Sequence, residues 1–409
     1  MGCNVCSKGH KQTPKRSTAP VKRPVSNNAI ITQKLYFGPE FAEEELYHKD
    51  PRILNSEEMK HNIKQWEAMA ENNNTIHEGL EKYYKLESKS FLERLKKGPP
   101  PKYRWAAWKT VLHTKEVFVK GLYEALIKPE MKAKSKWIKD IKGDVNRTFP
   151  EILNGSQRGL NDLVVGKLEN ILIAISLQCP KVGYCQGMNY VVGFMLLISN
   201  LEEEEVFWAF IALERDRLVQ DPWQICGVNG MYMEGFPKMN YVMECFHAIF
   251  AHFMPDLKKR FDSLRLIDLL WAYKWIFAFF LFSFPFSYCI RFWDYILAHG
   301  ISGSIRISLA IVKINERKLE GKDFNECYRI LDSFIDGSNL PSVEEILKVA
   351  DHFKINHHLL QNLKLGNYQT ESLVNIKNPS PNVMGDVGAE ARMNNVNAVI
   401  NQASKAILG

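Results

Sequence analysis

Apolar residues recur along most of this chain with the spacing of amphipathic helices. Leu168, Ile171, Leu172 and Ile175 fall at positions i, i+3, i+4 and i+7, which form one face of a helix. Runs that alternate apolar and polar positions are few, and no repeat of fixed period occurs. The pattern therefore predicts an all-α fold.

The same spacing predicts a series of helices in the middle of the chain. We expect helices over residues 190–198, 202–213, 239–253 and 304–314. The helix over 202–213 begins with four glutamates, whose charge suits the positive end of the helix dipole. Ser342 and Glu345 form a capping-box pattern that predicts the start of a further helix.

Changes in composition divide the chain into four parts. Residues 1–35 are polar, basic and rich in proline, which predicts a disordered arm. Residues 56–97 predict a helical extension, and residues 98–101 (Gly-Pro-Pro-Pro) end it because proline supplies no backbone donor. The main domain is expected over 98–353. Residues 366–409 predict a flexible tail, with at most a short helix over 393–407.

The most apolar segment covers residues 275–290. It is interrupted by Pro285 and closed by Lys274 and Arg291, whereas a membrane span needs about 20 apolar residues. We predict a buried helix that breaks at residues 283–285, rather than the alternative of an integral membrane protein. The N-terminus also lacks the apolar core of a secretory signal.

The net charge of +7 is concentrated near the N-terminus, where seven basic residues precede the first acidic one, Glu40. Such an arm suits an acidic membrane surface or a nucleic acid. The rest of the chain is close to neutral and has no long basic stripe, which argues against nucleic-acid binding.

The first residues predict a membrane attachment. Removal of Met1 would expose Gly2 for myristoylation, and Cys3 and Cys6 could be palmitoylated, although Cys6 departs from the usual Ser or Thr at that position. The alternative is an ordinary disordered terminus. No further Cys or His pair with zinc spacing lies nearby, so we predict no metal site. The six other cysteines are expected to be reduced thiols of a cytoplasmic protein.

Three short motifs carry candidate chemistry. Asp144 and Arg147 are three residues apart, so the carboxylate can orient a guanidinium whose donors match phosphate oxygens. Taken alone, such a pair is most often a surface ion pair. Gln186, before Gly187, reads alone as a structural amide. Arg104 and Trp108 read as a cation–π or packing pair that anchors the first helix of the domain.

Together the motifs resemble the TBC-domain family of Rab GTPase activators, over about residues 96–340. That family's fingerprints are R-x-x-x-W, I-x-x-D-x-x-R and Y-x-Q-G-M. They match, in order, Arg104 and Trp108; Ile141, Asp144 and Arg147; and Tyr184, Gln186, Gly187 and Met188. Trp293-Asp294 is also similar to the family's second half.

The resemblance implies a multi-helix domain that acts on a partner by two fingers. Arg147 matches the arginine finger and Gln186 the glutamine finger. Asp144 would orient Arg147, Tyr184 would shape the loop that carries Gln186, and Arg104 and Trp108 match structural positions.

The implied partner is a GTP-bound Rab-type GTPase in membrane traffic. The chain has no phosphate-binding P-loop and no kinase motifs, so we expect no cofactor of its own; GTP and Mg²⁺ would arrive with the partner. It would therefore activate another enzyme and would not be a stand-alone enzyme. We expect a cytoplasmic protein that is peripherally attached to the cytosolic face of the plasma membrane or of an endomembrane. The alternative is a scaffold of the same fold that binds a GTPase without accelerating it. The presence of both fingers favours the activator. The Rab concerned, the role of 56–97 and the oligomeric state stay open at this point.

Overall fold

The computed structural model describes residues 57–71, 73–149, 158–215 and 227–365, apart from single positions at 333, 336, 338, 339 and 364. The elements in these ranges are α-helices and two short 3-10 helices, which confirms the all-α prediction. The predictions of a disordered arm over 1–35, of lipidation and of a flexible tail over 366–409 lie outside the described residues.

Three helices form the N-terminal extension: α4 (Glu57–Ala70), α5 (Ile76–Leu86) and α6 (Ser88–Lys97). The chain turns at Glu87, so the helical pattern over 76–95 belongs to two helices. α6 ends at Gly98, whose φ of 96° favours glycine, and a β-carbon there would lie 2.8 Å from Cζ of Arg291. α7 (Pro101–Leu112) then begins with proline in its first turn, as the predicted break requires.

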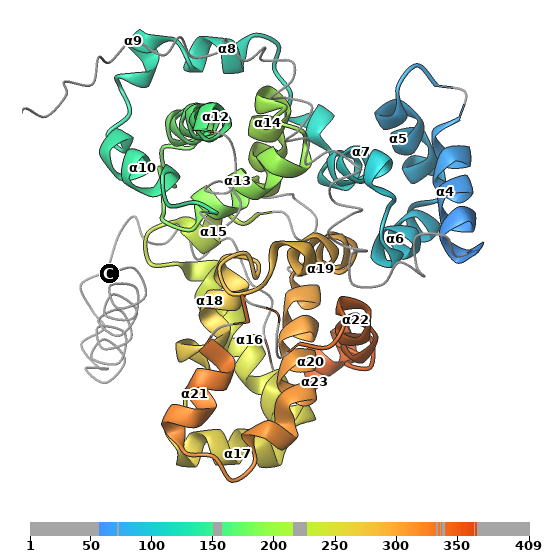
Figure 1. The fold of residues 1–409 in the computed structure, drawn as a ribbon, viewed down its shortest axis with the longest axis vertical. Coiled ribbons are helices and arrows are strands. Elements are labelled where there is room, and N and C mark those ends of the chain that lie inside the picture. Colours follow the sequence, from blue (N-terminus) through green and yellow to red (C-terminus); the bar gives the residue numbers. More distant parts are fainter. Residues whose placement is uncertain are drawn as a thin grey trace, which may run out of the picture.

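The extension packs directly on the rest of the molecule (Figure 1). α5 lies against α7, and α6 lies against α19 (Phe286–His299). The buried ring of Trp66 stacks on Tyr103 with 6.3 Å between centroids. Arg291 Nη2 donates to the carbonyl of Lys96 at 3.2 Å. The extension therefore shares its apolar core with the domain.

One half of the domain surrounds an apolar central helix, α13 (Met188–Ile198), whose side chains are buried on nearly every face. It packs against both α12 and α14, which also contact each other, and α10 packs on α12. Figure 1 shows α8 and α9 along the outer edge of this half. Its elements after α7 are η1 (Thr114–Glu116), α8 (Leu122–Leu126), α9 (Pro129–Lys132), α10 (Ile138–Val145), α12 (Arg158–Gln178) and α14 (Glu203–Glu214).

The other half contains the helices that follow residue 227, and its helix α19 contacts α6 and α7 as well as α20 and α22 (Figure 1). The predicted capping box is confirmed at the start of α22 (Val343–Ala350). The Ser342 hydroxyl accepts from the backbone N–H of Glu345, and the Glu345 carboxylate accepts from the backbone N–H of Ser342. The remaining elements are α15 (Asn229–Tyr232), α16 (Pro237–Phe253), α17 (Pro255–Ser263), η2 (Asp268–Leu270), α18 (Ala272–Phe277), α20 (Ile301–Leu319), α21 (Phe324–Asp332) and α23 (His357–Asn362).

The prediction for residues 275–290 is only partly right. The segment is mostly buried, but α18 already ends at Phe277, before the predicted break at 283–285. Phe279 and Phe280 adopt left-handed φ values of 47° and 69°, and the indole of Trp293 donates to the Phe279 carbonyl at 3.3 Å. Packing of the rings therefore overrides helix continuation here. No helix in the described ranges is both long and apolar enough to cross a membrane.

Candidate functional site

Arg147 lies two residues beyond the end of α10. Its Nε and Nη2 atoms both donate to Asp144 Oδ1, at 3.0 and 2.6 Å. The Arg147 side chain is 41% exposed, whereas that of Asp144 is 11% exposed. α10 stops at Val145, and the buried Phe149 has a left-handed φ of 49°. The guanidinium is therefore oriented by a mostly buried carboxylate while part of it faces solvent.

Gln186 lies on the segment between α12 and α13, which two glycines shape. At Gly183 (φ 64°) the indole of Trp137 occupies the place where a β-carbon would be. At Gly187 (φ 110°) a β-carbon would lie 2.9 Å from the ring of Phe277. The side chain of Gln186 is partly exposed, while those of its neighbours Tyr184 and Met188 are buried. The segment therefore presents Gln186 at the surface.

Asp144 joins the two segments. Its Oδ1 accepts from Arg147, and its Oδ2 accepts from the Tyr184 hydroxyl at 2.5 Å. Burial, and then the bond to Asp144, raise the pKa of Tyr184, so its hydroxyl stays a proton donor. We call the contact between Asp144 and Tyr184 the first bridge. It connects residues that are 40 positions apart in sequence.

A second bridge was not predicted from the sequence. Asn189 Nδ2 donates to the Thr148 hydroxyl at 2.9 Å, and Asn189 Oδ1 accepts from the backbone N–H of Gly187 at 2.9 Å. The Thr148 hydroxyl in turn donates to the Asp144 carbonyl at 2.9 Å. Asn189 is fully buried. An amide in the first turn of an otherwise apolar helix is the sequence signal that could have drawn attention to it.

The family model for the Rab-GTPase-TBC domain matches residues 101–320, which is more than half of the chain. The chain belongs to the Rab-GTPase-TBC domain family. The matched residues include all three motifs, from Arg104 to Met188, together with Asp294.

Curated relatives and solved structures agree with this assignment. This TBC protein is 25% identical over 280 residues to the human ecotropic viral integration site 5 protein homolog, covering 68% of this chain and 32% of that one. It is 28% identical over 243 residues to TBC1 domain family member 2A of Bos taurus, covering 59% and 25% of the two chains. It thus spans a third or less of the length of these relatives.

Two solved structures share the fold. The Chlamydomonas flagellar RabGAP TBC domain superposes with a TM-score of 0.53 at 22% identity, over 74% of this chain and 96% of that one. The Ypt/Rab-GAP domain of Gyp1p gives a TM-score of 0.56 at 16% identity, over 76% and 100%. At these identities the likeness shows the fold alone.

The two residues of the first TBC motif, Arg104 and Trp108, fix α7 to α19. Arg104 and Trp108 are both buried and both bind Asp294 on α19: Arg104 Nε donates to Oδ2 at 3.2 Å, and Trp108 Nε1 donates to Oδ1 at 2.8 Å. Arg291 Nη1 also donates to Asp294 Oδ2, at 3.1 Å. The expected anchoring of the first domain helix therefore comes from a shared carboxylate, and Trp108 stacks on Trp293 at 5.7 Å between centroids.

The thiol and metal chemistry of this site is limited. Burial, and then the nearby Asp144, raise the pKa of Cys185 to about 12, which favours the protonated thiol next to Gln186 at neutral pH. Within the described ranges, no group of three or more His, Cys, Asp or Glu side chains could hold a metal ion.

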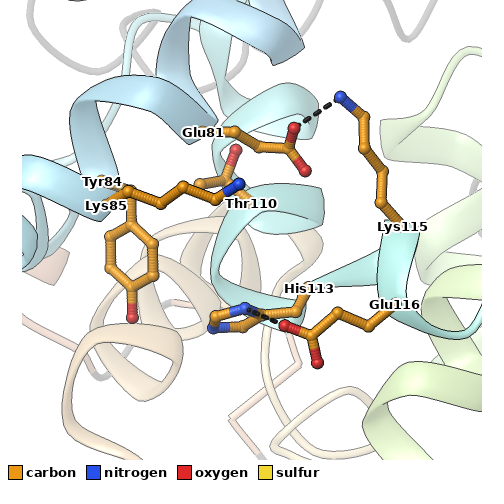
Figure 2. A pocket seen from close by; sticks show the side chains of 7 residues that line it. All are labelled: Glu81, Tyr84, Lys85, Thr110, His113, Lys115 and Glu116. Carbon is orange, nitrogen blue, oxygen red and sulfur yellow. Dashed lines mark hydrogen bonds and ion pairs between the residues drawn. The ribbon is translucent and has the colours of Figure 1, made fainter.

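A separate cavity of about 310 Å³ lies between the extension and the domain (Figure 2). In it, Lys115 pairs with Glu81 at 2.5 Å and His113 contacts Glu116 at 3.0 Å. Its lining shares no residue with the segments of Arg147 and Gln186, so it is not part of their site. The lining residues are Glu81, Tyr84, Lys85, Thr110, His113, Lys115 and Glu116.

Proposed function

We propose that this TBC protein accelerates GTP hydrolysis by a Rab-type small GTPase, supplying Arg147 and Gln186 to the partner's active site. One observation carries the proposal: the partly exposed Arg147 is oriented by Asp144, and the same carboxylate binds Tyr184 on the segment of Gln186. Both motif side chains thus lie on segments that are fixed to each other and reach the surface.

The chemistry of phosphoryl transfer fits this arrangement. The reaction needs little covalent help from a protein, and positioned charge supplies most of the acceleration. Arg147 would neutralise charge that develops around the γ-phosphate, and an arginine supplied in this way is worth on the order of 10³ to 10⁵ in rate. Gln186 would orient the attacking water. GTP and Mg²⁺ would enter with the GTPase, so the proposed reaction needs no cofactor held by this chain.

The test is single-turnover GTP hydrolysis by a panel of GTP-loaded Rab proteins, with and without the full chain. We expect strong acceleration of at least one Rab, loss of that acceleration in Arg147→Ala, and a large reduction in Gln186→Ala. Arg329→Ala, an exposed arginine on α21, is the matched control and should keep full activity. Acceleration that survives Arg147→Ala would refute the mechanism. Binding of a GTP-loaded Rab without acceleration by the wild-type chain would instead support the scaffold function.

We also propose that the chain is held at the cytosolic face of a membrane and acts in vesicle traffic. Myristate on Gly2 with palmitate on Cys3 or Cys6 would give the two signals that stable anchoring needs, and the basic arm would add attraction to anionic lipid. Labelling of cells with a myristate analogue tests this. Absence of label on the wild type, or label retained in Gly2→Ala, would exclude N-myristoylation.

A further inference from the structure

We infer that Thr148 and Asn189 are positioning residues that fix the separation between Arg147 and Gln186. This inference rests on the proposed function, because it concerns how the two fingers are held together. Neither residue belongs to the three motifs, and neither would touch the GTP.

The positions of the two bridges along the chain carry the argument. Arg147 lies between Asp144 and Thr148, and Gln186 lies between Tyr184 and Asn189. The first bridge joins the residues before the fingers, and the second joins the residues after them. Each finger is therefore held on both of its sides, and each side is bonded to the segment that carries the other finger.

The hydrogen bonds of the second bridge have only one consistent direction. The Gly187 N–H can only donate, so the Asn189 atom that faces it must be the carbonyl oxygen. The Asn189 NH₂ group then faces Thr148, whose hydroxyl accepts it and donates its own proton to the Asp144 carbonyl. Each of these groups thus has a hydrogen-bond partner in a buried setting, and removal of one partner leaves another unpaired.

The second bridge also restrains the backbone directly after Gln186. Asn189 holds the Gly187 N–H, while the Phe277 ring lies against the other side of that glycine. On the facing segment, the Thr148 methyl group lies close to Gly193 of α13, where a β-carbon would come within 3.0 Å of it. The loop of Arg147 is therefore seated on α13, the helix that follows Gln186.

The experiment compares Thr148→Val with a matched control. Thr110→Val removes a hydroxyl that is equally buried and donates to a backbone carbonyl at the same 2.9 Å, but this hydroxyl lies in α7, away from the fingers. Thr148→Ser keeps the hydroxyl, whereas Thr148→Ala has a small side chain without it. The Ser and Ala pair repeats the comparison should valine at 148 prevent folding.

The first measurement needs no GTPase. Hydrogen exchange of the full chain should become faster across residues 184–189 in Thr148→Val and Thr148→Ala. It should stay unchanged there in Thr110→Val, and it should change much less in Thr148→Ser, which keeps the hydroxyl and loses only the methyl group on Gly193. Unchanged exchange over 184–189 in both hydroxyl-free variants would overturn the inference, whether or not the protein activates a GTPase.

The second measurement is single-turnover hydrolysis by a responsive Rab. Loss of one positioning hydrogen bond predicts a maximal rate about tenfold lower. The concentration of this chain at half-saturation should stay the same, and Thr148→Ser should restore the rate. A change in half-saturation alone would overturn the positioning role. If the wild type accelerates no Rab, the proposed function fails, and the exchange measurement still decides whether the second bridge holds the two segments together.

Discussion

Replacement of Asp294 by asparagine should destabilise the fold strongly. Its side chain is fully buried and accepts from Arg104, Arg291 and Trp108 at 2.8 to 3.3 Å. Arg291 also pairs with Glu344, but Arg104, at 5% side-chain exposure, has no other acidic partner among the described residues. Breaking a buried pair by removing one charge costs about 3–5 kcal/mol, because the other charge stays buried and uncompensated.

Urea titration followed by circular dichroism measures this loss in the free energy of unfolding. Asp351→Asn is the control: that carboxylate is 39% exposed and pairs with Lys96 at 3.5 Å. It also accepts from the Tyr295 hydroxyl at 2.9 Å, a bond that the asparagine oxygen can keep, so the change should stay below about 1 kcal/mol. Arg104→Met combined with Asp294→Asn should be less destabilising than Asp294→Asn alone, since it removes the uncompensated charge. A loss below about 1 kcal/mol in Asp294→Asn would refute the assignment of this carboxylate as the anchor of α7.

Two further predictions follow from the structure. Gly187→Ala should lower the free energy of unfolding more than Gly321→Ala does, and it should also slow GTP hydrolysis by the partner. Both glycines have a positive φ, but only at 187 would a β-carbon meet a ring, that of Phe277, at 2.9 Å. Equal losses of unfolding free energy in urea titrations would contradict this. Burial lowers the pKa of His299 from 6.5 to about 4, so between these pH values the unfolded state binds more protons, and stability should fall as the pH drops from 6.5 to 4. His299→Gln should lose part of this fall; an unaltered pH dependence of unfolding would show that His299 does not contribute.

Local signals predicted most helices well, because helix periodicity and capping depend on residues that are close in sequence. The capping box at Ser342 and the proline break before α7 are examples. Prediction was poorest where distant side chains decide the backbone, as at Phe279 and Phe280, whose left-handed conformation accompanies packing of their rings in the core.

The hydrogen bonds between the motifs could not be predicted from the sequence either, because they join residues that are far apart along the chain. Asp144 was expected to orient Arg147, but its bond to Tyr184 crosses 40 positions. Asp294 was noted only as a match to the family's second half, and its bonds to Arg104 and Trp108 cross nearly half of the chain. Such contacts depend on how α7, α10, α13 and α19 pack, and the pattern along one chain does not contain that arrangement.

The carbonyls of Lys96 and Pro99 have a practical consequence for how this domain is produced. Arg291 binds the first and Arg104 the second, at 3.2 and 2.7 Å, and Glu344 of α22 binds Arg291 from the other end of the chain. The family match runs only from 101 to 320. A recombinant fragment limited to those residues would lack Lys96, Pro99 and Glu344, so the buried Arg104 and Arg291 would lose these hydrogen-bond partners. It would also expose the apolar faces of α7 and α19 that pack on the extension. The packed core is therefore larger than the matched range, and fragments for biochemistry should begin before α4 and end after α22.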